Sequence, residues 1–182
     1  MPPLFMNQVI QQSKGFTLLE VMVTITILVV LISAGLPQMG AWVESNQMNS
    51  RASTIVGLLR AARSEALTRN NTVTLATNGA SQDWANVIDM YVDTSGGNDP
   101  FNASNGDEFI REVDLSSNNI TINGNSTAGR YISFSGDGRL DEDGQTAIIE
   151  ICNGTNTNNG QTISINIVGR VSVSEGVTDC TP

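Results

Sequence analysis

The stretch KGFTLLE at residues 14–20 opens an apolar run that lasts to Leu36. Residues 16–36 form a segment of 21 residues with a single charge, Glu20. About 20 residues rising 1.5 Å each cross the ~30 Å hydrocarbon core of a bilayer, so this run predicts a transmembrane helix. A secretory signal peptide is the alternative, but its apolar core has only about 7 to 15 residues before a small-residue cleavage site. The longer run here argues against such a peptide.

Glu20 is the one acid within this apolar run. A carboxylate at the centre of a spanning helix costs roughly 2.5 to 3.5 kcal/mol, less near the ends, so such residues usually have a partner. Cleavage between Gly15 and Phe16 would create an α-amino group four residues away, about 6 Å along the helix axis. A neighbouring subunit would supply the same group. The alternative is a carboxylate that reaches the membrane interface.

The motif Gly-Phe-Thr-Leu-Leu-Glu at residues 15–20, followed by an apolar helix, resembles the class III signal of type IV pilins and pseudopilins. The resemblance implies that a prepilin peptidase cuts after Gly15 and that the amino group of Phe16 is then methylated. It also implies that Glu20 supports the docking of subunits into a filament. Lys14 matches the basic residue that usually precedes the glycine, and Pro37 stands where pilins often have a helix-bending proline.

The signal and the patterns that follow it divide the chain into four expected segments. They are a leader at residues 1–15, a transmembrane half-helix at 16–36, an amphipathic half-helix at 37–70 and a β-rich globular head at 71–182. The length of the last segment suits one modest domain. Pro37 and Gly40 predict a bend or a local loss of helix near the membrane surface.

Apolar residues recur with helical spacing after Pro37. The stripe consists of Met48, Ala52, Ile55, Leu59, Ala62 and Ala66, widened by Leu58 and Leu67. This spacing predicts one amphipathic helix that stops at Asn70-Asn71. We expect the stripe to pack on the sheet of the head, and a surface for a partner protein is the alternative.

The rest of the chain has short β-branched and aromatic runs separated by Gly, Asn, Asp and Ser, which is typical of strands joined by turns. The predicted strands are residues 72–76, 87–92, 109–115, 120–122, 131–134, 147–152, 163–168 and 170–173. Ile163, Ile165 and Ile167 alternate with polar residues and are expected to face one side of a sheet. Gly169-Arg170 predicts a turn or a bulge. The expected fold class is α+β, a long N-terminal membrane-spanning helix packed on a β-sheet head.

Three further stretches resemble the FimT, FimU and GspH group of minor pilins and pseudopilins. They are residues 60–66 late in the helix, 134–139 in the middle of the head and 165–171 near its end. The resemblance covers most of the chain. It implies a subunit that lies at or near a filament tip or helps to start assembly, hence a minor type IV pilin, with a type II secretion pseudopilin as the alternative.

The resemblance also implies the partners and the location of the chain. The expected partners are the prepilin peptidase, the other minor pilins, the major pilin and the inner-membrane assembly platform. The expected location is the inner membrane, crossed once, with a periplasmic head, and then the filament.

The head is strongly acidic. Beyond Asn70 it has fifteen acids, four arginines and neither lysine nor histidine, a net charge of about −11, which repels phosphate backbones and anionic lipids. Some members of the resembled group bind DNA through a Gly-Arg-x-Arg element, whereas residues 169–172 read Gly-Arg-Val-Ser. Direct DNA binding through Arg170 is thus the lesser alternative. The plainer interpretation is that Arg170 closes a turn and pairs with an acid.

Cys152 and Cys180 are the only cysteines. A head exported to an oxidising compartment favours a disulfide between them, and closing this loop of roughly 28 residues would stabilise the fold by about 3 to 4 kcal/mol. Two free buried thiols are the alternative. A zinc site is not expected, because two cysteines without histidine cannot fill its coordination shell.

Neither a metal, a cofactor nor an enzymatic activity is expected. Calcium is the alternative for two acidic clusters, one of Asp137, Asp141, Glu142 and Asp143 and one of Asp93, Asn98, Asp99, Asp107 and Glu108. Neither has EF-hand spacing, so solvated loops are the favoured interpretation. The sequence has no histidine, no Gly-x-Ser-x-Gly elbow and no phosphate-binding loop.

Overall fold

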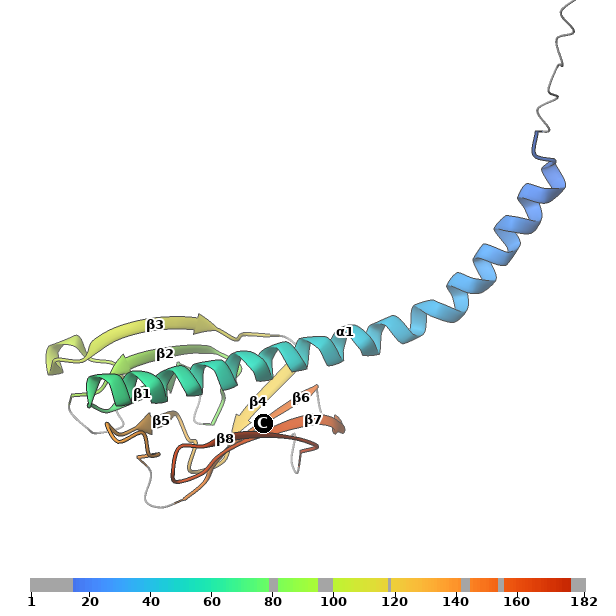
Figure 1. Ribbon diagram of the computed structural model, residues 1–182. Helices are drawn as coiled ribbons and strands as arrows, with labels where there is room; N and C mark the ends of the chain where they lie inside the picture. The colour runs from blue at the N-terminus through green and yellow to red at the C-terminus, as the bar shows by residue number, and fades with distance from the viewer. Residues whose placement is uncertain are drawn as a thin grey trace, which may run out of the picture. The chain divides into compact units, whose positions relative to one another are not determined.

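The computed structural model describes residues 15–78, 82–94, 100–117, 119–141, 145–153 and 156–177, without the side chains of residues 34–39, 41 and 156–159. Within these ranges one long helix is followed by eight strands (Figure 1). The chain divides into two compact units, residues 1–42 and residues 43–182, and each is described by itself. Helix α1, Leu18–Arg69, has residues in both.

Helix α1 begins with a side-chain cap. The backbone nitrogen of Glu20 donates to Oγ1 of Thr17 at 3.2 Å, and the backbone nitrogen of Val21 donates to the Thr17 carbonyl at 3.2 Å. Thr-x-x-Glu is the sequence pattern of a capping box. The helix therefore starts at Leu18 rather than at Phe16, and Glu20 lies in its first turn, where the helix dipole favours an acid.

From Leu18 to Ser33 the side chains of α1 are exposed, and most of them are apolar. Its hydroxyl groups are bonded inside the helix: Thr24, Thr26 and Ser33 each donate to the carbonyl three or four positions earlier, at 2.8 to 2.9 Å. These hydroxyls are therefore satisfied without water, as an apolar environment requires.

Helical geometry continues through Pro37. Of the two effects predicted there, loss of helix is not observed, and the bend stays a prediction. Over the described ranges, no helical segment is both long and apolar enough to cross a membrane.

Two antiparallel sheets form the strand part of the second unit. The first has the order β3-β2-β1-β5 and contains β1 (Val73–Thr77), β2 (Val87–Val92), β3 (Glu108–Asp114) and β5 (Tyr131–Phe134). The second has the order β4-β6-β7-β8 and contains β4 (Ile120–Gly124), β6 (Ala147–Asn153), β7 (Asn156–Ile165) and β8 (Val171–Glu175). A single turn of 3₁₀ helix, Ala103–Asn105, precedes β3.

The C-terminal part of α1 shares one hydrophobic core with both sheets. All six positions of the predicted stripe are buried, from Met48 to Ala66, and Leu58 is buried with them. Burial of each large apolar side chain contributes roughly 1.5 to 3 kcal/mol, which makes this stripe the main attachment of the helix to the head. The α+β fold class is confirmed, with two sheets where the strand pattern alone suggested one.

Two apolar residues were predicted to be buried and are not. Leu67 is 51% exposed, because it lies at the rim of the core, over the turn that contains Gly138. Ile167 is 37% exposed, although Ile163 and Ile165 are buried as predicted. Strand β7 ends at Ile165, so the alternation of sides does not extend to Ile167.

Strand β7 also begins seven residues earlier than predicted. Its first half, residues 156–162, is almost entirely polar and lacks the apolar alternation of a strand. Strand β7 lies between β6 and β8, and Gln161 and Thr162 pair with residues of both neighbours. Backbone hydrogen bonding on two sides holds these polar residues in the sheet.

Candidate functional site

The predicted processing residues lie at the start of the described chain. Phe16 is 82% exposed, and a Cβ atom built on Gly15 meets nothing within 4 Å. The bond between Gly15 and Phe16 is therefore open to a peptidase. Glu20 is exposed, and no ion pair of its side chain is found among the described residues. In the uncleaved chain the Phe16 nitrogen is an uncharged amide, so a partner amine arises only by cleavage or from another subunit.

In the head, Arg63 on α1 joins the three stretches that carried the FimT, FimU and GspH resemblance. Its Nε donates to the Gly138 carbonyl at 2.8 Å, and its Nη2 donates to the Val168 carbonyl at 2.9 Å. Both acceptors lie in turns, one after β5 and one between β7 and β8. We call Arg63, Gly138, Val168 and Gly169 the Arg63 clamp. It fixes the end of each sheet to the helix.

Gly169 allows the two turns to meet. Its backbone has φ +73°, and a Cβ atom here would lie 2.2 Å from the Gly138 carbonyl oxygen and 2.9 Å from Nε of Arg63. Its amide donates to the Asn166 carbonyl at 2.8 Å and closes the turn before β8. The turn predicted at Gly169-Arg170 is thus observed. The clamp itself was not predicted, since its acceptors are backbone atoms distant in the sequence.

We expect Arg63→Met to destabilise the head by roughly 2 to 4 kcal/mol, because two charge-assisted hydrogen bonds to carbonyls are lost while the aliphatic stem is kept. The check is denaturant unfolding of the full chain in detergent. Arg60→Met is the matched control: Arg60 is exposed one turn earlier, and its replacement should change stability by less than about 0.5 kcal/mol. Equal effects of the two substitutions would contradict the clamp.

The turn after β5 is organised by Asp137. Its Oδ1 accepts hydrogen bonds from the Ser135 hydroxyl at 2.7 Å and from the Arg139 backbone nitrogen at 3.1 Å. The Ser135 hydroxyl, followed by the Arg139 amide, lowers the pKa of Asp137 below its usual 3.8. The ionised carboxylate therefore supports the turn that presents the Gly138 carbonyl to Arg63.

This lowered pKa predicts an acid-sensitive turn. The contribution of Asp137 to stability is fully present above the unfolded value of 3.8 and is lost as the pH falls through the lower folded value. Asp137→Asn should therefore reduce the melting temperature near neutral pH, and its difference from wild type should shrink as the pH falls below 3.8 and through the lower folded value. Thermal unfolding across pH checks this, with Asp141→Asn as an exposed control. A difference independent of pH would contradict it.

A shallow groove of about 380 Å³ lies beside the clamp. Its lining residues are Arg60, Arg63, Ser64, Leu67, Gly169, Arg170 and Val171, and we call it the basic groove. The Arg170 amide donates to Oδ1 of Asn166 at 2.8 Å, so Arg170 closes the turn as predicted. The predicted ion pair of Arg170 is not found among the described residues, where the ion pairs both involve Arg69.

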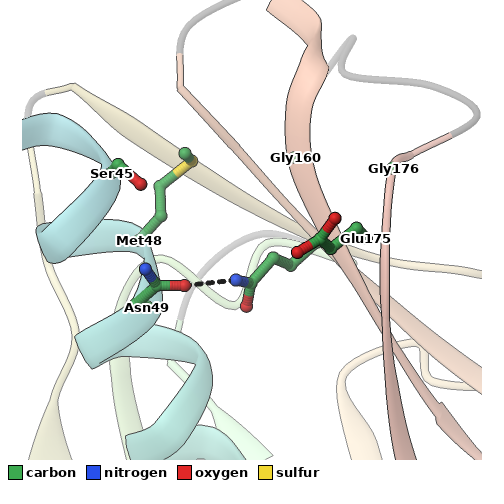
Figure 2. Close-up of a pocket in the computed structure, with 7 residues that line it drawn as sticks. Ser45, Met48, Asn49, Gly160, Glu175 and Gly176 are labelled. Atoms are coloured by element: carbon green, nitrogen blue, oxygen red, sulfur yellow. Dashed lines mark hydrogen bonds between the residues drawn. The ribbon is translucent and has the colours of Figure 1, made fainter. Parts of the chain in front are cut away.

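A second, polar crevice of about 300 Å³ separates α1 from β7 and β8 (Figure 2). Gln161 on β7 donates from Nε2 to Oδ1 of Asn49 on α1, and Glu175 lies on the far wall. A Cβ atom on Gly160 would lie 2.4 Å from Val177, so the strand approaches its neighbour closely here. The bond across the crevice marks it as a seam between helix and sheet rather than an open binding site.

Cys152 lies in β6 with only 1% of its surface exposed. It is not a free thiol. Cys180 lies outside the described residues, so the link between the two cysteines stays a prediction.

The acidic clusters considered for calcium are only partly described. Glu142, Asp143, Asn98 and Asp99 lie outside the described ranges. Asp107 is buried and uses its two oxygens to accept from the backbone nitrogens of Thr94 and Asn102. Among the residues described, no group of three or more His, Cys, Asp or Glu side chains is placed to hold a metal ion.

Comparisons with known protein families give two matches, one to the N-terminal segment and one to most of the rest of the chain. Residues 51–169 match the family model described as type II transport protein GspH, and residues 10–36 match the prokaryotic N-terminal methylation motif. The first match spans all four residues of the clamp. A search of the curated proteins found no significant match.

Two solved structures share the fold. Both are of the type IV minor pilin FimU of Pseudomonas aeruginosa strain PAO1, in different crystal forms. One is 22% identical with a TM-score of 0.63 and covers 77% of this chain and 99% of that chain. The other is 21% identical with a TM-score of 0.59 and covers 73% and 99%. The chain belongs to the GspH family and is a minor pilin or pseudopilin with an N-terminal methylation motif.

Proposed function

We propose that the chain is a minor type IV pilin, a structural subunit that joins or primes pilus assembly near the filament tip. The observation that carries this proposal is the capped start of α1. An exposed bond between Gly15 and Phe16, an acid without an ion pair among the described residues and an exposed apolar helix follow one another there. An apolar helix of this kind needs a lipid or protein environment, and a filament core is the protein environment that its family provides.

Processing would create a positively charged partner for Glu20. Prepilin peptidase hydrolyses the bond between Gly15 and Phe16, and the released amine of Phe16 is methylated and stays cationic. In the inner membrane, residues 16–36 anchor the chain once, and the head lies in the periplasm. As the helix enters the filament, Glu20 pairs with a Phe16 amine, which is less costly than leaving either charge alone in an apolar medium.

The expected partners follow from this route. They are the prepilin peptidase, the inner-membrane assembly platform, the other minor pilins and the major pilin. The methyl group of Phe16 would come from a methyl donor used by the peptidase. No cofactor is expected on the chain itself, and nothing in the comparisons points to DNA as a ligand. Arg170 therefore has no assigned part in DNA capture in this proposal.

A type II secretion pseudopilin is the second candidate, because the matching family model carries the description of a type II transport protein. The FimU structures, which share the fold, favour the pilus. The two candidates differ in the filament that contains the chain.

Quantification of the chain in sheared surface filaments separates these candidates. The proposal predicts that the chain is recovered from cells without the secretion platform and is lost from cells without the pilus platform. The opposite dependence would assign it to the secretion filament. If filaments from wild-type cells and from both kinds of mutant cell lack the chain, it is not a filament subunit.

A further inference from the structure

The basic groove is a cationic patch on an acidic head. Arg60, Arg63 and Arg170 line it together, whereas the head beyond Asn70 has a net charge of about −11. Cations that share one groove repel each other unless an anion lies between them. Their convergence from the helix and from the turn before β8 therefore requires a separate explanation.

None of these arginines has an anionic partner among the described residues, and the side chains of two of them make no hydrogen bond there either. Arg63 uses Nε and Nη2 for carbonyls of the clamp. Arg60 and Arg170 are exposed, and no hydrogen bond or ion pair of either side chain is found among the described residues. Arg69, near the end of α1, differs from these two arginines because it has anionic partners. It pairs with Glu65 at 2.8 Å and with Glu108 at 2.9 Å.

The acid of the turn that contains Gly138 is already hydrogen-bonded within that turn. Asp137 accepts from the Ser135 hydroxyl and from the Arg139 amide. Its carboxylate thus stabilises its own turn instead of neutralising the groove. Two guanidinium groups remain for a ligand from outside the head.

The groove is also held in shape before any ligand arrives. Arg60 projects from α1 one turn before Arg63, and Arg170 follows Gly169 directly in the chain. The clamp joins these two backbones through the Val168 carbonyl and the close approach at Gly169. The clamp thus fixes the positions of the two backbones that carry Arg60 and Arg170, and guanidinium groups suit a planar carboxylate.

We propose that the basic groove receives an acidic segment of a neighbouring filament subunit, whose carboxylates pair with Arg60 and Arg170. The inference rests on the proposed function, which supplies the neighbouring subunit. A groove of about 380 Å³ with Leu67 and Val171 in its lining holds a few side chains and offers both cationic and apolar contacts.

DNA fits the same groove less well. If Arg60 and Arg170 neutralise two phosphates, the logarithm of the binding constant falls with the logarithm of the salt concentration with a slope of only about −1.8. Little affinity therefore comes from counterion release. The acidic head repels the rest of a duplex. A short acidic peptide segment needs only the two free arginines.

Site-specific photo-crosslinking in cells tests the proposal. The photoreactive residue replaces Ser64, which is exposed in the groove lining, in the full-length chain. We expect a crosslink to another pilin subunit, and mass spectrometry should place it in a segment that contains Asp or Glu. The charge reversals Arg60→Glu and Arg170→Glu together should reduce the crosslink at least fivefold.

The matched control is the pair Arg111→Glu and Arg130→Glu, which changes the net charge equally at exposed positions outside the groove lining. This pair should leave the crosslink within about twofold of its original yield. A crosslink to nucleic acid, a crosslink to a segment without acids, equal loss in both variants, or no crosslink would each overturn the proposal.

The amount of wild-type chain in sheared filaments is measured in the same cells. Its absence from filaments refutes the proposed function. Its presence without a charge-dependent crosslink refutes only the groove.

Discussion

Gly169→Ala should destabilise the head by about 3 to 5 kcal/mol, the largest effect expected of any small substitution in it. Two costs add. Alanine at φ +73° is strained by roughly 1 to 2 kcal/mol. Its Cβ atom would also lie 2.2 Å from the Gly138 carbonyl oxygen, so the two turns must separate and the hydrogen bonds of Arg63 are weakened.

Gly176→Ala is the control for this substitution. Gly176 has a similar left-handed backbone, φ +89°, but a Cβ atom there meets nothing within 4 Å. It should therefore show the strain alone, about 1 kcal/mol. Denaturant unfolding of both full-length variants gives the comparison. Similar losses of stability would show that the close approach at Gly169 is unimportant, and the clamp would then lose its main support.

Glu20→Ala should leave cleavage intact and reduce entry into filaments at least tenfold. The substitution does not touch the exposed bond between Gly15 and Phe16, and helix α1 keeps the Thr17 cap, which binds the backbone nitrogen of residue 20. It removes the carboxylate that would meet a Phe16 amine. An amine left unpaired in an apolar interface costs several kcal/mol, and each 1.4 kcal/mol is a factor of ten.

Two further variants separate charge from shape at this position. Glu20→Gln keeps the length of the side chain without its charge and should fail as Glu20→Ala does. Thr24→Ala, one turn later on the same helix, removes only a hydroxyl that bonds to the Val21 carbonyl and should enter filaments normally. The measurement is the ratio of each mature variant in the sheared filament fraction to that in the membrane. Normal entry of the glutamine variant would exclude a role for the charge.

Local patterns in the sequence predicted most of the helix. The stop at Asn70 and the buried positions from Met48 to Ala66 each depend on residues within a few positions, whose spacing is visible in the chain. Asn70 has φ 49°, the left-handed conformation that an asparagine at a helix end tolerates. The helix was therefore predicted to within two residues at its start.

Features that depend on distant contacts were missed. The polar part of β7 becomes a strand through its neighbours, since Asn156 pairs with β6 and Gln161 and Thr162 pair with both β6 and β8. The spacing of its own side chains gives no sign of this. The Arg63 clamp joins residues 75 and 105 positions apart through backbone acceptors. Its parts were nevertheless within the three stretches that resembled the pilin group, so the resemblance marked a contact that spacing could not reveal.

Mass spectrometry of the chain recovered from sheared surface filaments tests the central claim most directly. The account predicts a mature protein that begins at Phe16 with one methyl group on its α-amine, and with Cys152 linked to Cys180. A chain in the filament fraction that still begins at Met1, or that is cut at another bond, would contradict the processing on which the docking role of Glu20 depends.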